Sequence, residues 1–172
     1  MSFIDEAAIH LKAGSGGNGC LSFRREKFIP KGGPDGGDGG KGGSIFFKAD
    51  SSLTTLQDFR LQKKYQAKNG STGEGKNKHG KDAKDIILKV PVGTVIFEET
   101  TEEEIADLKK DGELFEVVSG GRGGLGNARF KSSTNRAPRK TTEGEKGEEL
   151  SLQLELRLIA DVGLLGLSLI HI

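Results

Sequence analysis

Glycine recurs at every third position in several separate stretches of this sequence. Polyproline II has three residues per turn, so a glycine in every turn leaves one edge of such a helix without side chains. Two bare edges can approach each other closely, and we therefore predict that the glycine runs form packed polyproline-II segments. The structural glycines of the two clearest series are Gly33, Gly36, Gly39 and Gly42, followed by Gly120, Gly123 and Gly126.

Two other kinds of glycine-rich chain fit this pattern less well. The chain holds 27 glycines among 172 residues, roughly twice the average share of about 7 %. Flexible linkers are also rich in glycine, but they need no period of three and are rarely interleaved with β-strands. A collagen triple helix needs long uninterrupted repeats, whereas strand-like sequence interrupts each run here.

Between the glycine runs, apolar and polar residues alternate as they do in half-buried strands. Residues 150–158 are the clearest case, because every second residue there is leucine. The turn signal at Asp111 and Gly112 predicts a hairpin that joins residues 103–108 to residues 113–118. The first of these arms also suits one helical turn, through Ile105 and Leu108. Further strands are expected over residues 7–13, 21–23, 44–49 and 86–97, with a break at 91–93, and one short helix within 53–64.

The expected fold class is therefore mainly β, with glycine-rich polyproline-II helices projecting from a small β-barrel or sandwich. Cys20 is the single cysteine, which fits a reducing compartment. The first residues lack the basic and apolar regions of a signal peptide, and no stretch has the ~20 apolar residues that span a bilayer. We expect a monomer in the cytoplasm, with no membrane contact.

Charge is segregated along the chain, although the formal net charge is only +1. Acidic residues cluster over residues 98–104 and 143–149, whereas basic residues border the glycine runs. Residues 22–28 place cations beside two phenylalanines, and residues 127–140 add Ser, Thr and Asn, which bond phosphate readily. Such segments are typical of RNA binding through phosphate contacts and base stacking. The predicted RNA-binding residues are Arg24, Arg25, Lys27, Lys31, Lys41, Lys76, Lys78, Lys81, Arg122, Arg129, Lys131, Arg136, Arg139 and Lys140.

Other motifs carry no chemistry. Residues 14–19 match the dinucleotide pattern G-x-G-x-x-G, but a strand follows where that motif needs a helix. Asp35 and Asp38 faintly resemble a calcium β-roll without its nonapeptide repeats, so we expect them to bond nearby backbone amides. The three histidines are scattered, and neither Gly40–Lys41 nor Gly75–Lys76 is followed by Ser or Thr. The sequence predicts no catalytic, cofactor-binding or metal-binding residue in this chain.

Four segments together resemble the Obg (CgtA) GTPases: residues 12–19, 22–28, 32–43 and 120–127. The resemblance implies the Obg fold over residues 1–158, on a bacterial assembly factor for the large ribosomal subunit. It also implies that residues 24–43, 70–81 and 120–140 form tip loops that contact the subunit's rRNA near the peptidyl-transferase region.

The enzyme of that family is a G domain that uses GTP and Mg²⁺. Residues 159–166 resemble the first strand of that domain, but the tail 167–172 lacks the expected lysine and serine and departs from the family pattern. We therefore expect a ribosome-binding domain that does not itself bind or hydrolyse GTP. The alternatives are a fragmentary record of a full-length, magnesium-dependent GTPase, or a glycine-rich structural or protein-interaction module.

Overall fold

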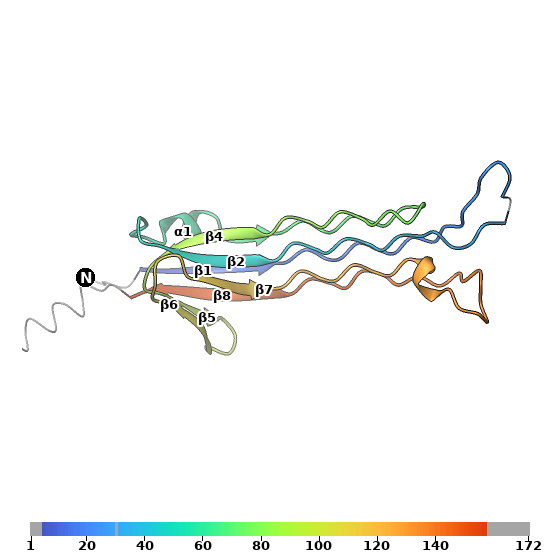
Figure 1. Ribbon diagram of the computed structural model, residues 1–172. Helices are drawn as coiled ribbons and strands as arrows, with labels where there is room; N and C mark the ends of the chain where they lie inside the picture. Colours follow the sequence, from blue (N-terminus) through green and yellow to red (C-terminus); the bar gives the residue numbers. More distant parts are fainter. Residues whose placement is uncertain (1–4, 30, 158–172) are drawn as a thin grey trace, which may run out of the picture.

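A computed structural model describes residues 5–29 and 31–157. The chain forms a β-sheet base from which long extended segments project side by side in one direction (Figure 1). The mainly β prediction is confirmed. The predicted start of a G domain, residues 159–166, and the tail 167–172 lie outside the described residues.

The base contains a five-stranded sheet in the order β3-β1-β8-β5-β6. Its centre is the antiparallel pair of β1 (Asp5–Lys12) and β8 (Glu149–Leu156), which runs in register from Asp5 opposite Leu156 to Lys12 opposite Glu149. The short β3 (Lys64–Gln66) extends the sheet parallel to β1. On the other side, β5 (Thr94–Glu98) pairs with β8 and then with β6 (Glu104–Leu108).

A second sheet has three strands in the order β4-β2-β7. Its middle strand, β2 (Ile45–Asp50), runs parallel to β4 (Ile86–Pro91) and antiparallel to β7 (Leu114–Val118). The predicted strands over 7–13, 44–49, 86–97 and 150–158 thus have counterparts. Gly93 adopts φ +94° at the predicted break, a conformation that favours glycine.

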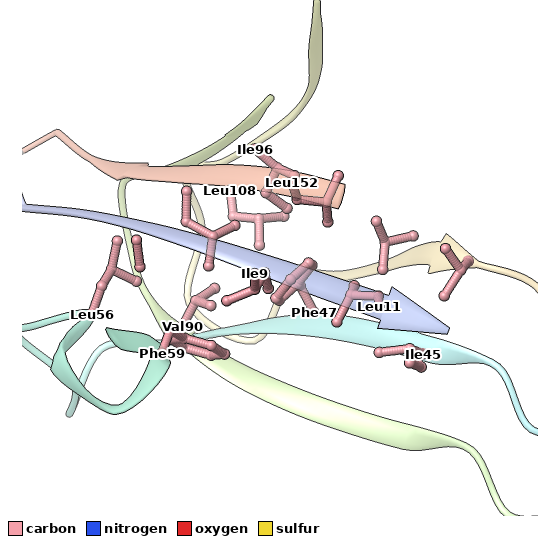
Figure 2. Packing of buried hydrophobic residues seen from close by; sticks show 14 of the residues in the cluster. Ile9, Leu11, Ile45, Phe47, Leu56, Phe59, Val90, Ile96, Leu108 and Leu152 are labelled. Atoms are coloured by element: carbon pink, nitrogen blue, oxygen red, sulfur yellow. The ribbon is translucent and has the colours of Figure 1, made fainter. Parts of the chain in front are cut away.

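The core lies where the two sheets face each other (Figure 2). Alternation along β1 points Ile9 and Leu11 inward, and they pack with Phe47 of the other sheet. The predicted short helix is α1 (Gln57–Leu61), whose Phe59 ring meets that of Phe47 edge-on at 6.3 Å between centroids. Burial of each such side chain stabilises the fold by about 1.5–3 kcal/mol.

Two local predictions are wrong. The turn at Gly112 forms, with φ +81°, but the strands on either side join different sheets. β6 pairs with β5 and β7 pairs with β2, so β6 and β7 do not form a hairpin. The predicted segment 103–108 contains the strand β6 and is not a helical turn. Residues 21–23 form no strand: Phe23 makes only an isolated bridge to Pro34.

Six extended segments form the shaft beyond the base, and we name them arms A to F. Arms A (13–20), C (67–74) and E (119–127) leave β1, β3 and β7, whereas arms B (36–43), D (78–85) and F (142–148) lead into β2, β4 and β8. Gly126, with φ −73° and ψ 162°, has the backbone conformation of polyproline II. The arms are laid side by side in Figure 1.

Hydrogen bonds between the arms follow the period of three. In arm A the amides of Ala13, Gly16 and Gly19 donate to carbonyls of arm F at 2.8, 2.9 and 3.1 Å. The amides of Gly14, Gly17 and Cys20, each one residue after a donor to arm F, donate to carbonyls of arm B. In arm B the amides likewise take turns, because some donate to arm C and others to arm E. One edge of each turn therefore faces one neighbour, which is the packed arrangement that the glycine spacing predicts.

The glycines sit where arms touch. A Cβ added at Gly39 would overlap the carbonyl oxygen of Gly17 in arm A, and one at Gly123 would overlap that of Gly39. Gly33 differs, because the nearest heavy atom to its added Cβ is the Lys131 ammonium nitrogen at 3.5 Å. A similar overlap with backbone oxygens arises at Gly36, Gly42, Gly120 and Gly126.

Candidate RNA-binding tip

The connections between the arms form the end of the molecule that is farthest from the base (Figure 1). Loop 1 (residues 21–35) joins arms A and B, and loop 3 (residues 128–141) joins arms E and F. We call these two loops the tip. Arms C and D are joined by a shorter turn, residues 75–77, which ends before the tip does.

All fourteen predicted RNA-binding side chains are exposed, but they do not form one group. Lys76 lies on the 75–77 turn. Lys41, Lys78, Lys81 and Arg122 lie along the arms. The cations on loop 1 are Arg24, Arg25, Lys27 and Lys31, and those on loop 3 are Arg129, Lys131, Arg136, Arg139 and Lys140.

Loops 1 and 3 enclose an open hollow of about 490 Å³, which we call the cationic hollow. Its cations come from both loops, and no acidic side chain is among the described residues that line it. The guanidinium of Arg139 lies over the Phe23 ring, 5.5 Å from its centroid. Clustered cations attract phosphates, and an aromatic face with an arginine beside it favours stacking of a base. The charged residues that line the hollow are Arg24, Arg25, Lys31, Lys131, Arg136 and Arg139.

Two further aromatic rings on the tip carry cations. Phe28, in the middle of loop 1, is 86 % exposed, and the Lys27 ammonium lies 5.6 Å from the centroid of its ring. On loop 3 the Lys140 ammonium lies 5.1 Å from the Phe130 ring. Both pairs resemble the mixture of stacking surface and positive charge found in single-strand binding sites.

Some of the predicted cations are paired within the chain. The Arg24 guanidinium donates to Glu26 at 3.0 and 3.1 Å, which raises the pKa of Arg24 and lowers the pKa of Glu26. Arg129 Nε donates a hydrogen bond to Asp38 Oδ2 at 2.9 Å, and Arg129 Nη2 lies 2.9 Å from the same oxygen in an ion pair. Arg129 thus also fastens loop 3 to arm B, and its charge is partly neutralised there.

Asp38 connects arms B and E. Its burial alone would raise the pKa of the carboxyl, but hydrogen bonds from the Gly126 amide and from Arg129 outweigh that effect and lower the pKa. The Gly126 amide donates to Asp38 Oδ1 at 2.9 Å, across 88 positions of the sequence. Asp35 likewise accepts from the Lys76 amide, 41 positions away. The expectation that both carboxylates bond nearby amides was therefore wrong, since their partners lie on other segments.

Asn127 fixes the two loops to each other, a role that the sequence did not predict. Its side chain is fully buried, so it is not one of the polar groups that face solvent in residues 127–140. Oδ1 accepts from the amides of Gly36 and Ser22 at 2.9 and 3.3 Å, and Nδ2 donates to the carbonyls of Ser22 and Pro138 at 2.8 and 3.2 Å. Its position after the last glycine of arm E is the only signal that the sequence offers.

In the described residues, 5–29 and 31–157, no helix has the length and apolar character needed to cross a membrane. The same residues hold no cluster of three potential metal-ligating side chains.

Comparison with known proteins identifies the family. The sequence model of the GTP1/OBG family matches residues 4–158. The protein named GTPase Obg from Persephonella marina (strain DSM 14350 / EX-H1) is 57 % identical over 166 residues, which cover 96 % of this chain and 49 % of that protein. The chain therefore spans about half the length of this relative. It belongs to the GTP1/OBG family, as its resemblance to the Obg GTPases predicted.

Proposed function

We propose that this domain binds rRNA of the large ribosomal subunit through its tip and acts in assembly of that subunit. The observation that supports the proposal most strongly is the cationic hollow, where two loops far apart in sequence contribute cations around one aromatic ring. Phosphate contacts would supply most of the affinity, and stacking on Phe23 and Phe28 would favour unpaired bases.

The shaft makes this proposal physically reasonable, because it fixes the loops before binding. The arms are cross-linked by backbone hydrogen bonds along their length, and Asn127 and Asp38 fasten the loops at the end. Preorganised loops lose less conformational entropy on binding than flexible ones. The segregated charge also favours docking by the tip, since the acidic residues at 98–104 lie on the base.

The proposal is tested by replacing Arg24, Arg25 and Lys27 together with alanine. We expect binding to purified large ribosomal subunits to weaken by at least about tenfold, because three cations near phosphates are lost. Co-sedimentation at a fixed salt concentration measures the change.

The matched control removes three exposed lysines of the base, Lys48, Lys63 and Lys110. It deletes the same number of positive charges and should leave subunit binding nearly unchanged. Equal weakening by both triple variants would indicate nonspecific attraction and would contradict a binding site at the tip.

The name of the relative supports a second proposal, which concerns the longer protein. We propose that GTP hydrolysis with Mg²⁺ belongs to a G domain beyond the residues described here, and that the protein works in the bacterial cytoplasm. The sequence from 1 to 172 contains no Gly-Lys-Ser or Gly-Lys-Thr. We expect no GTPase rate from this chain, and we expect that motif within about eight residues after Gly166 in the gene of the longer protein. A GTPase rate from the purified chain would overturn this assignment.

A further inference from the structure

A second hollow lies against loop 1, next to the 75–77 turn, and it has a different chemistry. Its volume is about 520 Å³, and we call it the Asp35 hollow. It shares Phe23, Arg24 and Arg25 with the cationic hollow. The residues that it does not share with the cationic hollow are Ser22, Glu26, Asp35, Gly75, Lys76 and Asn77.

Asp35 is held in place by three hydrogen bonds. Its amide donates to the Ser22 carbonyl at 3.0 Å, its carbonyl accepts from the Asn77 amide at 2.7 Å, and its Oδ2 accepts from the Lys76 amide at 3.1 Å. The last two bonds stabilise a turn in which Lys76 and Asn77 have φ of 62° and 56°, a conformation that is uncommon outside glycine. These contacts fully account for a structural role of the residue.

The other carboxylate oxygen is not explained by that role. Asp35 is only 8 % exposed, and its Oδ1 has no hydrogen-bond partner among the described residues. Leaving a buried acceptor without a donor is costly, more so when the group is charged. A ligand that supplies a donor to Oδ1 would therefore gain affinity from an interaction that the free protein leaves unmade.

The neighbours of Asp35 indicate which donor fits. Arg24, Arg25 and Lys76 line the same hollow, so the ligand would carry a donor close to negative charge. A ribose in RNA has this combination, because its 2′-hydroxyl lies between successive phosphates. The Watson–Crick edge of guanine offers two parallel donors, whereas here one oxygen is free and the other is bonded to the Lys76 amide.

We propose that the Asp35 hollow is a ribose-phosphate subsite in which Asp35 Oδ1 accepts a hydrogen bond from one 2′-hydroxyl of bound RNA. This inference rests on the proposed function and adds discrimination between RNA and DNA. The cations of the hollow hold the flanking phosphates, and Asp35 distinguishes the sugar. Because Oδ1 is buried, the residues around it must shift on binding for the hydroxyl to reach it.

The test compares binding of the whole 172-residue chain to a short single-stranded RNA and to the same sequence with 2′-fluoro sugars. Fluorine cannot donate a hydrogen bond, but it preserves the sugar pucker of RNA. We expect the wild-type chain to prefer RNA by about tenfold, as for one hydrogen bond to a charged acceptor. In Asp35→Asn the oxygen can still accept from the Lys76 amide while the NH₂ replaces Oδ1. The hydroxyl then no longer meets a charged acceptor, so the preference should fall several-fold.

The control variant is Glu26→Gln, which removes an exposed carboxylate from the same hollow. It should change the affinity for both oligonucleotides alike and keep their ratio.

If wild type binds both equally, the ribose subsite is refuted while RNA binding by the tip stands. If Asp35→Asn keeps the wild-type ratio, the hydroxyl is recognised elsewhere and the assignment is also wrong. Failure to bind either RNA or large subunits contradicts the proposed function itself. Should Asp35→Asn not fold, the wild-type ratio still decides.

Discussion

At the scale of single residues, the shape of the tip depends on buried and partly buried polar side chains rather than on the exposed cations. Asn127 uses both ends of its carboxamide to join Ser22 and Gly36 of one loop region to Pro138 of the other. Asp38 does the same with Gly126 and Arg129. The exposed cations are placed correctly only because these uncharged and acidic groups hold their loops.

Replacement of Asn127 by alanine should therefore be more damaging than its size suggests. The change removes the partner of the Ser22 and Gly36 amides and of the Pro138 carbonyl, and we expect a loss of about 3 kcal/mol in the free energy of unfolding. Urea denaturation measures it. Asn18→Ala is the control, since it removes one exposed hydrogen bond, which the Gly144 amide donates to Asn18 Oδ1, and should cost less than about 1 kcal/mol. Equal losses in the two variants would contradict the role given to Asn127.

Asp38 should make stability depend on pH. Its pKa is lowered in the folded chain, so its ionised form stabilises the fold above the unfolded pKa of about 3.8 and that contribution disappears as the pH falls through the folded value. Asp38→Asn should lower the stability at neutral pH by roughly 1–2 kcal/mol. Thermal unfolding from pH 7 down to about pH 2 should show a constant difference between the wild type and the variant above about pH 4 and convergence below it. A difference that stays constant down to about pH 2 would contradict the assignment.

At the scale of elements, the arms show why glycine recurs with a period of three. Each turn of an arm directs one backbone edge at a neighbouring arm, and the approach leaves no room for a Cβ. The strands of the base are governed instead by alternation, as in β1 and β8. The alternation of the strands changes to the period of three at the points where a strand and an arm adjoin in the chain.

Gly39→Ala and Gly33→Ala form a matched pair that tests this account of the arms. At Gly39 the new methyl would overlap the Gly17 carbonyl, whereas at Gly33 the nearest atom is 3.5 Å away at the end of a flexible lysine. We expect Gly39→Ala to lower stability by about 1–3 kcal/mol or more, and Gly33→Ala to change it by less than about 1 kcal/mol. Melting temperatures measure both, and similar shifts would be inconsistent with packed arms.

The sequence predicted those elements whose signal is local. Alternation located most of the long strands, and the glycine period located the arms. The hairpin prediction was wrong because a turn such as Asp111–Gly112 fixes a chain reversal but not the strand partners, which are chosen by packing elsewhere. β3 escaped prediction because three residues, Lys64–Gln66, are too few to show a period.

At the scale of the whole molecule, the shaft separates a basic tip from a base with acidic loops. Composition and spacing were enough to name the exposed cations of loops 1 and 3. They were not enough to find the cationic hollow or the roles of Asn127 and Asp35. Those features depend on contacts between residues more than 40 positions apart in the sequence, and a local sequence pattern does not reveal such contacts.

The central claim is that both loops of the tip contact RNA as one site, and the salt dependence of large-subunit binding tests it most directly. The slope of log Kd against log salt counts the phosphate contacts, at about 0.7–0.9 for each one. Alanine at Arg24, Arg25 and Lys27 should reduce the slope by about 2.1–2.7, and alanine at Arg136 and Arg139 should reduce it by about 1.4–1.8. The base control at Lys48, Lys63 and Lys110 should keep the wild-type slope. Wild-type slopes in both tip variants would contradict the account.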